Sequence, residues 1–509
     1  MSKRGDRHDH APHAHHRPGR LGGPPRKGPT PITADHTPAH RRAAPDQAAR
    51  LRHLPDTERD IIRLASDPRF TRWLEQVTAT GACTHPIHLA GSTTVHDRAT
   101  GEVLHHYDTT GEPGERLLIR CRNRRASICP TCSRLHAGDT YHLVRAGLTG
   151  GRNVPGTVRD HPRLFVTLTA PSFGPVHRST DGQPCRPRRG GARCGHGRPL
   201  ACREQHAPQE PRVGQPLCPD CYDYPGHVLW HAHTGRLWKA ITDNLYNHLA
   251  ARTGRTRGGV RRAVRISFAK IAEYQKRAAI HLHAVLRVDG GEGPGKRPPP
   301  WADAATLASA VRSSTAAVRL AIPYTPALGE RELCWGTQLD IRPLRAFGDD
   351  ESLTDDAVAA YVAKYVTKGA DETGAGLDRR IRQPEDIATA RVSAHVRALM
   401  GTCWRLGGLR ELGALNLRAW AHTLGFRGHI LTKSRVYSTT YAALREERAE
   451  HQRGEDGGPV PAGLDAETVS AWRYVGSGHS PGGAALAAGI AADLDRNREE
   501  VREIRGGPW

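Results

Sequence analysis

Two histidines separated by one residue form the first group of side chains that could take part in chemistry. His281 and His283 flank Leu282 in AAIHLHAVLRV, a run of branched apolar residues that predicts a strand. Because side chains alternate between the faces of a strand, both imidazoles lie on one face and Leu282 lies on the other. Such a pair can bind one divalent metal ion, and the alternative is a pair of ordinary structural histidines.

Two tyrosines in AYVAKYVTKG form the second candidate group. Tyr361 and Tyr365 lie one turn apart on the same face if this segment is a helix, and Lys364 and Lys368 each follow a tyrosine by three residues. A phenol with a pKa near ~10 is a poor nucleophile at neutral pH. A nearby lysine and a metal ion that polarises a phosphate would remove much of that handicap. The alternative is that both tyrosines simply pack on a sheet.

A carboxylate could complete a ligand set with the two histidines, and Glu273 is the nearest one. The sequence predicts a β-hairpin with a polar turn near residues 275–278, but leaves the length of its loop open. A two-residue loop places Glu273 opposite Ile280, on the wrong face, and a three-residue loop places it opposite His281. A surface salt bridge is the alternative role of Glu273. Magnesium prefers oxygen ligands, so manganese suits two histidines better.

The cysteines form two clusters with the spacing of metal ligands. Cys129 and Cys132 have the C-x-x-C spacing of half a tetrahedral zinc site, and Cys121 would be a third ligand. Cys83 or His136 could complete the four. A redox motif is the alternative, but the usual preceding strand is missing.

The second cluster lies in a segment of Pro, Gly and Arg that has too few apolar residues for a core. A structural zinc ion would explain how this segment folds, and a disordered insertion with fortuitous cysteines is the alternative. His196 and His206 could each replace a thiolate. The expected ligands are Cys194, Cys202, Cys218 and Cys221.

Strands and helices must position these groups, and their pattern predicts an α+β fold with a central antiparallel sheet flanked by helices. RLFVTLTAP at 163–171 predicts another strand, and residues 227–250 predict a long amphipathic helix. Zinc-binding elaborations and a disordered N-terminal arm would surround the sheet.

The composition divides the chain into four parts. Residues 1–50 form a basic His/Pro-rich arm with too few apolar side chains to fold, and residues 51–160 form a helical region with the first Cys cluster. Residues 161–445 form the main domain, which carries the Cys-rich insertion at 180–225. Residues 446–509 form a peripheral C-terminal tail.

Charge and hydropathy restrict the function further. The formal net charge is +22 at pH 7, which indicates a polyanionic partner such as nucleic acid. No run approaches the ~18 to 20 apolar residues of a membrane span, and the N-terminus lacks the apolar segment of a secretory signal. We therefore expect a cytoplasmic protein without membrane contact. It has no P-loop, so any helicase would be a separate host protein.

The order of the motifs FVTLTAP, IHLHAV and AYVAKYVTKG resembles that of the HUH superfamily of rolling-circle replication initiators, in its two-tyrosine form. The phrases AEYQKRAAIHLHAVLRVDG, CPDCYDYPGHVLWHAHTGRLW and RGHILTKSRVYSTTYAALR further resemble RepSA-like initiators of actinobacterial plasmids and integrative elements. This resemblance covers residues 60–450. It implies an HUH endonuclease-like sheet whose middle strands hold Thr167 and Thr169 beside the two histidines.

The resemblance also implies a nicking reaction. His281 and His283, with Glu273, would bind Mg²⁺ or Mn²⁺ at the scissile phosphate of origin DNA, which is nicked as a single strand or an extruded hairpin. One tyrosine would form a 5′-phosphotyrosine link and free a 3′-OH, which a host polymerase and helicase would use.

We expect Tyr365 to attack first with help from Lys368, and Tyr361 to act second with help from Lys364. A non-catalytic, zinc-stapled DNA-binding protein is one alternative, although it does not explain why HLH and the doubled YxxK occur together. An HUH relaxase or transposase acting on another site is the other.

Overall fold

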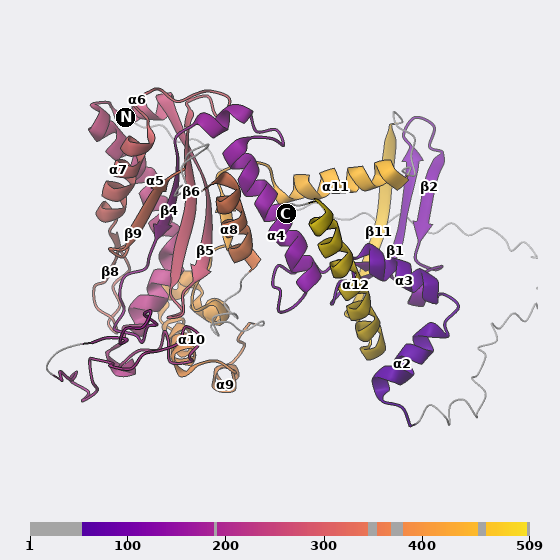
Figure 1. Cartoon of the computed structure of the whole chain (residues 1–509), viewed down its shortest axis with the longest axis horizontal. Helices are drawn as coiled ribbons and strands as arrows, with labels where there is room; N and C mark the ends of the chain where they lie inside the picture. The colour runs from indigo at the N-terminus through magenta and orange to yellow at the C-terminus, as the bar shows by residue number, and fades with distance from the viewer. Residues whose placement is uncertain (1–52, 188–190, 345–353, 368–379, 457–464, 506–509) are drawn as a thin grey trace, which may run out of the picture. The chain divides into compact units, whose positions relative to one another are not determined.

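The structure is a computed structural model that describes residues 53–187, 191–344, 354–367, 380–456 and 465–505. Helices and antiparallel sheets together build the described chain, as Figure 1 shows, so the predicted α+β class is confirmed. The predicted arm at residues 1–50 and the candidate Lys368 lie outside the described residues. None of the described helices is long and apolar enough to cross a membrane.

A five-stranded antiparallel sheet forms the centre of the fold. β5 and β6 are neighbours, with β10 on the outer side of β5, and with β4 and then β9 beyond β6. In spatial order the strands are β10 (Leu431–Lys433), β5 (Val264–Tyr274), β6 (Ile280–Gly290), β4 (Arg163–Leu168) and β9 (Leu339–Pro343). Because β5 and β6 consist largely of branched and apolar residues, they suit this position inside the sheet.

The loop between β5 and β6 decides which residues face each other across the hairpin. The two strands pair over their whole length and are joined by residues 276–278. The last loop residue, Ala278, has a φ of 60°, the left-handed conformation that three-residue hairpin loops require at this position. Of the two predicted alternatives the structure has the three-residue loop, which places Glu273 opposite His281.

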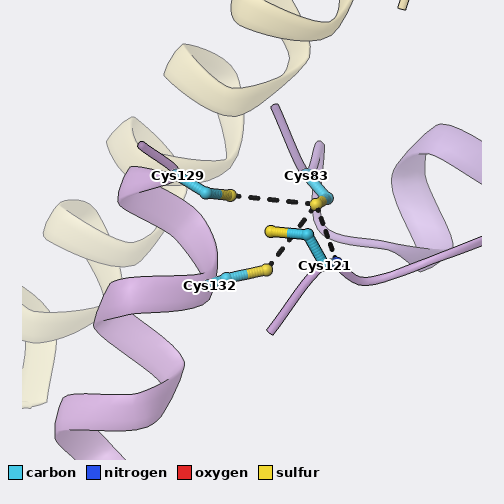
Figure 2. A group of neighbouring side chains, drawn as sticks. All are labelled: Cys83, Cys121, Cys129 and Cys132. Atoms are coloured by element: carbon cyan, nitrogen blue, oxygen red, sulfur yellow. Dashed lines mark hydrogen bonds between the residues drawn. The ribbon is translucent and has the colours of Figure 1, made fainter. Parts of the chain in front are cut away.

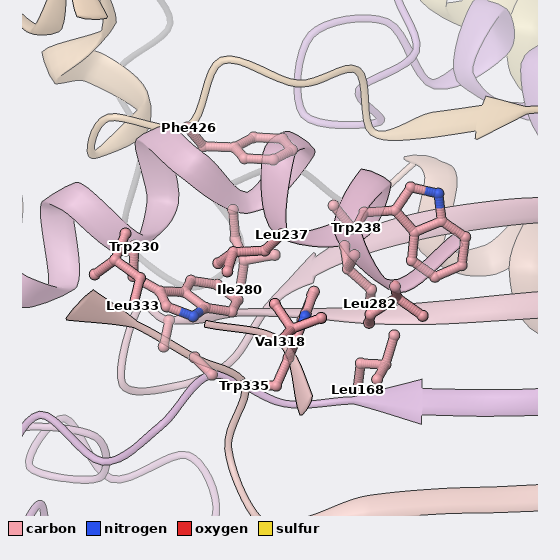
Figure 3. Close-up of a cluster of buried hydrophobic side chains, with 14 of the residues drawn as sticks. Leu168, Trp230, Leu237, Trp238, Ile280, Leu282, Val318, Leu333, Trp335 and Phe426 are labelled. Atoms are coloured by element: carbon pink, nitrogen blue, oxygen red, sulfur yellow. The ribbon is translucent and has the colours of Figure 1, made fainter. Parts of the chain in front are cut away.

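One face of the sheet packs against α5 (Tyr224–Thr253), the long helix that the sequence predicts. Its N-cap residue Asp223 accepts a hydrogen bond from the backbone N–H of Gly226 at 2.9 Å, which satisfies one free donor of the first turn. Figure 3 shows the two tryptophans of α5, Trp230 and Trp238, close to the apolar side chains of β6. Leu282 is fully buried in this core, as expected for the residue between the two histidines.

The other face of the sheet packs against α4 (Pro130–Thr149) and α8 (Asp355–Thr367). Buried residues of α8 at every third or fourth position, such as Val358 and Val362, share one cluster with Ile271 of β5. This packing brings the tyrosine helix to the face that carries the two histidines.

A smaller antiparallel sheet joins the two ends of the described chain. β1 (Ile87–Asp97) pairs with β11 (Ala466–Ser477) on one side and with β2 (Val103–Asp108) and β3 (Leu117–Ile119) on the other. The segment predicted to be a peripheral C-terminal tail therefore supplies one strand, β11, at the edge of this sheet. Residues 51–160 are also not purely helical, because three of these strands belong to them.

The remaining elements connect and cover the two sheets. α12 packs against α2, so the C-terminal helix also contacts the start of the described chain. These elements are α2 (Asp56–Ala65), α3 (Phe70–Ala79), α6 (Arg257–Ala263), α7 (Ala304–Ala317), β7 (Leu320–Ala321), β8 (Glu332–Leu333), α9 (Pro384–Ala388), α10 (Ala394–Leu406), α11 (Tyr441–Asp456) and α12 (Pro481–Arg505).

Candidate active site and metal-binding clusters

Glu273, His281 and His283 meet on the face of the β5–β6 hairpin that α8 covers. The Oε2 atom of Glu273 lies 3.0 Å from Nε2 of His281 and 3.0 Å from Nε2 of His283. The two Nε2 atoms are 3.2 Å apart. These three atoms converge on one point, so the residues could hold a metal ion with two nitrogens and one oxygen.

Two residues of β4 fix the orientation of the His283 ring. Thr167 pairs with His283 across the sheet, and its Oγ1 lies 3.0 Å from Nδ1 of His283. Phe165 stacks on the same imidazole with an interplanar angle of 5°. With Nδ1 held by the hydroxyl, Nε2 is the nitrogen that faces Glu273. Thr169, which the sequence analysis also placed here, instead donates to the carbonyl of Gln338 at 2.7 Å.

The electrostatics of this group favour an ionised carboxylate at Glu273 and a neutral imidazole at His283. Burial opposes ionisation of Glu273, but hydrogen bonds from His281 and His283 outweigh it and lower the pKa of Glu273 to about 2. Burial also lowers the pKa of His283, against the attraction of Glu273. At neutral pH the carboxylate is therefore ionised, and a divalent cation bound there would replace the protons that the two Nε2 atoms share with it.

Both tyrosines of α8 lie beside this group. The hydroxyl oxygen of Tyr361 is 3.1 Å from Nε2 of His283, and its ring meets Phe165 edge to face. Tyr365 lies one turn further, with its ring centre 4.4 Å from that of Tyr361 and 6.1 Å from that of His283. Burial, and then the charge of Glu273, raises the pKa of Tyr361 well above its ordinary value.

The lysines that accompany the tyrosines are in different situations. The Nζ atom of Lys364 lies 5.9 Å from the ring centre of Tyr365, in a cation–π arrangement. The sequence predicted Tyr361 as the partner of Lys364, but this lysine lies over the ring of Tyr365. Lys368 follows the last described residue of α8 and lies outside the described chain.

The first cysteine cluster contains four thiols. Figure 2 shows Cys129 and Cys132 at the start of α4, facing Cys83 and Cys121 on two neighbouring loops. The sulfur of Cys83 is 3.8 Å from that of Cys129 and 3.6 Å from that of Cys132. The sequence allows Cys83 or His136 as the fourth ligand. Cys83 lies in the group, whereas His136 packs its ring against Tyr441.

The structure divides the second cluster into two groups and does not bring the four predicted cysteines together. Cys202 lies apart from Cys194, Cys218 and Cys221, which meet His196 instead. The Nδ1 atom of His196 is 3.2 Å from the sulfur of Cys221 and 3.8 Å from that of Cys218.

Cys202 belongs to a third group, which was not predicted from the sequence. Its other members are His177, Cys185 and His206. The sequence held a signal for it, since Cys185 was left without a role and His206 was considered only as a substitute ligand. Each of the three groups contains four residues whose ligand atoms lie within 4.8 Å of one another, so each could hold a metal ion.

Comparison with known proteins assigns the family. The family model described as RepSA, "Replication initiator protein, pSAM2", matches residues 69–492. A replication initiator protein of Streptomyces ambofaciens is 48% identical over 457 residues, which cover 88% of this chain and 96% of that relative. No solved structure matches the chain. The protein therefore belongs to the RepSA family of replication initiators.

Proposed function

We propose that this protein starts replication by cutting one strand of origin DNA with a tyrosine. The enzyme would become linked to the 5′ phosphate and would leave a 3′-OH for a host DNA polymerase, with a host helicase opening the duplex. The observation that supports this most directly is the 3.1 Å contact between the hydroxyl of Tyr361 and His283, inside a group able to hold a metal ion. Family membership supports the role in initiation.

Glu273, His281 and His283 would hold the catalytic Mg²⁺ or Mn²⁺. When bound, this ion would polarise the scissile phosphate and offset the charge that develops on it. The donor set fits a divalent cation, because it combines one ionised carboxylate with two imidazole nitrogens, and the nitrogens favour Mn²⁺. Thr167 would keep His283 in the orientation that presents Nε2.

The two tyrosines would supply the nucleophiles. Attack forms a bond between the phenolic oxygen and phosphorus and breaks the bond from phosphorus to the 3′ oxygen. The phenol loses one proton and the departing 3′ oxygen gains one, so the 3′ end is released as a free hydroxyl. Because the phosphotyrosine bond conserves the energy of the phosphodiester, a later attack can rejoin the strand.

We assign the first attack to Tyr361, because its hydroxyl contacts the metal-ligand group. This reverses the order expected from the sequence, which depended on the lysines around Tyr365. Tyr365 would then cut the regenerated origin. Lys364, whose charge lies over the ring of Tyr365, would stabilise the phenolate of that residue, and Lys368 would add a second positive charge.

We also assign structural Zn²⁺ to two of the cysteine groups. Four thiolates from Cys83, Cys121, Cys129 and Cys132 form a tetrahedral set that zinc prefers. The second set is Cys194, His196, Cys218 and Cys221. No open position for a substrate is required at either set, which suits ions that stabilise the fold.

A covalent-capture experiment tests the nicking proposal. The protein is incubated with labelled single-stranded fragments that tile the origin of its own element, with Mn²⁺, and separated on a denaturing gel. A protein-linked DNA band should form and should disappear with EDTA and in Tyr361→Phe. Tyr365→Phe should keep the first cut, and Tyr474→Phe, on exposed β11, is the matched control.

Two outcomes would contradict parts of this proposal. A band lost in Tyr365→Phe but kept in Tyr361→Phe would restore the order that the sequence suggested. No band on any fragment, together with tight binding of the same DNA, would favour the non-catalytic DNA-binding protein.

A further inference from the structure

The insertion between β4 and α5, residues 169–223, has very little hydrophobic core of its own. Its described part contains isolated bridges and one short 3₁₀ turn, Pro219–Cys221, but no longer helix or strand. Several of its most buried side chains are instead cysteines and a histidine: Cys185, Cys202, Cys218 and His206. A segment of this kind needs cross-links or metal ions to offset its conformational entropy.

The geometry of the third group is that of a tetrahedral metal site. The Nδ1 atom of His177 lies 3.1 Å from Nε2 of His206 and 3.8 Å from the sulfur of Cys185. The same Nε2 atom of His206 is 3.3 Å from the sulfur of Cys202. Around a zinc ion with bonds of about 2.0 to 2.3 Å, tetrahedral ligand atoms lie about 3.3 to 3.8 Å apart. We propose that His177, Cys185, Cys202 and His206 bind a structural Zn²⁺ ion.

The surroundings of the ligands support this assignment. Glu210 places its Oε2 atom 2.9 Å from Nδ1 of His206, which leaves Nε2 to face the group. A carboxylate on the outer nitrogen of a histidine is the usual support of a zinc ligand, since it fixes the ring and strengthens the other nitrogen as a donor. The backbone N–H of Arg178 also donates to the sulfur of Cys185 at 3.2 Å, which stabilises a thiolate.

The ligands of this site alternate along the chain with those of the neighbouring site. His177 and Cys185 come first, followed by Cys194 and His196 of the other group. Cys202 and His206 then return to the first group, and the last pair, residues 218 and 221, belongs to the other. Because the loops of the two sites are interlocked in this way, each ion would restrict the segments that hold the other.

This zinc site is connected to the hairpin that carries the candidate active site. The backbone of His177 bonds to both sides of one short segment, donating to Gln215 O and accepting from Gly214 N, each at 2.8 Å. Gly214 has a φ of 91°, and a Cβ atom added there would lie 2.1 Å from the carbonyl oxygen of Lys276. The segment therefore packs directly on the loop that sets the register of β5 and β6.

Arg277 strengthens the same connection from the side of the hairpin. Its guanidinium donates to the carbonyls of Pro171 and Ala170, at 2.9 and 3.0 Å, where the insertion begins. The zinc ion would thus hold in place the support of the 276–278 loop, and through it the alignment of Glu273 with His281. The assignment of the ion itself does not depend on the proposed nicking reaction.

Zinc content of the full-length protein tests the site. The metal is measured by mass spectrometry after dialysis, for the wild type, for Cys202→Ser and for Cys334→Ser. Cys334 belongs to none of the described clusters and is the matched control. Cys202→Ser should lose one zinc equivalent, or two if the interlocked site fails with it, and the control should lose none. Unchanged zinc in Cys202→Ser would overturn the proposal.

A second variant separates zinc binding from misfolding, because it keeps all four ligands. Glu210→Gln should lower zinc affinity about 10- to 100-fold in competition with a chelator. Glu204→Gln is its control, since Glu204 pairs with Arg212 and not with His206. Equal affinity in the two variants would overturn the supporting role of Glu210 at His206, whatever the outcome of the nicking assay.

Discussion

Histidines lie on both sides of the β5–β6 hairpin, and the two groups have opposite surroundings: His281 and His283 belong to β6, whereas His227 and His231 belong to α5. On the face covered by α8, the Nε2 atoms of His281 and His283 point toward each other and share the carboxylate of Glu273. No other described group neutralises this carboxylate. The nitrogens are arranged around a point where a cation would satisfy all of them.

On the opposite face, the ring nitrogens of His227 and His231 already have hydrogen-bond partners within the protein. The backbone N–H of Ile280 donates to Nε2 of His231 at 3.1 Å, so the neutral ring carries its proton on Nδ1, which faces the carbonyl of Leu424. His227 lies between His231 and the hydroxyl of Tyr222. All these contacts are with neutral groups inside the core.

This contrast gives a criterion that separates a ligand histidine from a structural one when both are buried beside the same sheet. His283 is 4% exposed and His231 is 1% exposed, so burial alone does not distinguish them. The partners do, because His231 has one hydrogen-bond donor and one backbone acceptor as partners, whereas the Nε2 atom of His283 converges with two other potential metal-ligand atoms.

The largest expected effect concerns the face of the hairpin that carries Glu273, His281 and His283. His283→Ala removes one of three metal ligands, so the covalent product should fall more than about a thousandfold, or ~4 kcal/mol of transition-state stabilisation. The free energy of unfolding should change much less, because Phe165 and Tyr361 still cover this position. Gel-based nicking and urea unfolding measure the two quantities, with His248→Ala on α5 as the control.

On the face of the hairpin that packs against α5, we expect a smaller effect, which falls on stability and not on nicking. His231→Ala leaves the N–H of Ile280 without an acceptor and opens a cavity, which together cost about 3 kcal/mol of folding free energy. Urea unfolding at pH 7 measures this loss, and the nicking rate per folded molecule should stay within about twofold of the wild type. A variant that stays stable but no longer nicks would show that the two faces are not independent.

The smallest effect concerns pH. Burial lowers the pKa of His231 to about 3, while the unfolded chain has the ordinary value of 6.5, so the unfolded state binds more protons between these values. Stability contributed by the neutral ring is therefore present above pH 6.5 and is lost as the pH falls toward 3. At pH 5 the loss from His231 alone is about 2 kcal/mol.

His231→Gln provides the comparison for this pH effect. Glutamine keeps an acceptor for Ile280 but cannot be protonated, so the free energy of unfolding should fall less steeply between pH 7 and pH 5 than in the wild type. Zinc is kept saturating in both titrations. Equal slopes would mean that His231 does not carry the acid sensitivity.

Periodicity was sufficient to predict the elements that hold the site. The alternation around His281 and His283 predicted their common face, and the four-residue spacing predicted the helix that brings Tyr361 and Tyr365 to it. The hairpin loop was harder, because its left-handed residue is Ala278, where glycine or asparagine would have marked a three-residue loop. The position of Glu273 therefore stayed open until the register was known.

Long-range partners could not be predicted from spacing. The spacing of cysteines and histidines shows which residues can bind metal but not which of them share an ion. In the insertion the ligands of two groups alternate along the chain, so residues that are close in sequence do not all belong to the same group. β11 gave no strand signal, since most of its side chains are exposed and do not alternate in polarity. Its pairing with β1 follows from the fold alone.

The pairing of β1 with β11 has a consequence for the time at which the protein can finish folding. Thr93 and Ser470, whose hydroxyls are 2.9 Å apart, are separated by 377 residues. A ribosome that adds about 5 to 20 residues per second needs roughly 20 to 75 seconds to make that stretch. Throughout this interval one edge of β1 lacks its partner and is open to association with other nascent chains. Chains released early would keep that edge exposed, which makes completed synthesis a condition for closing the β1–β11 pair.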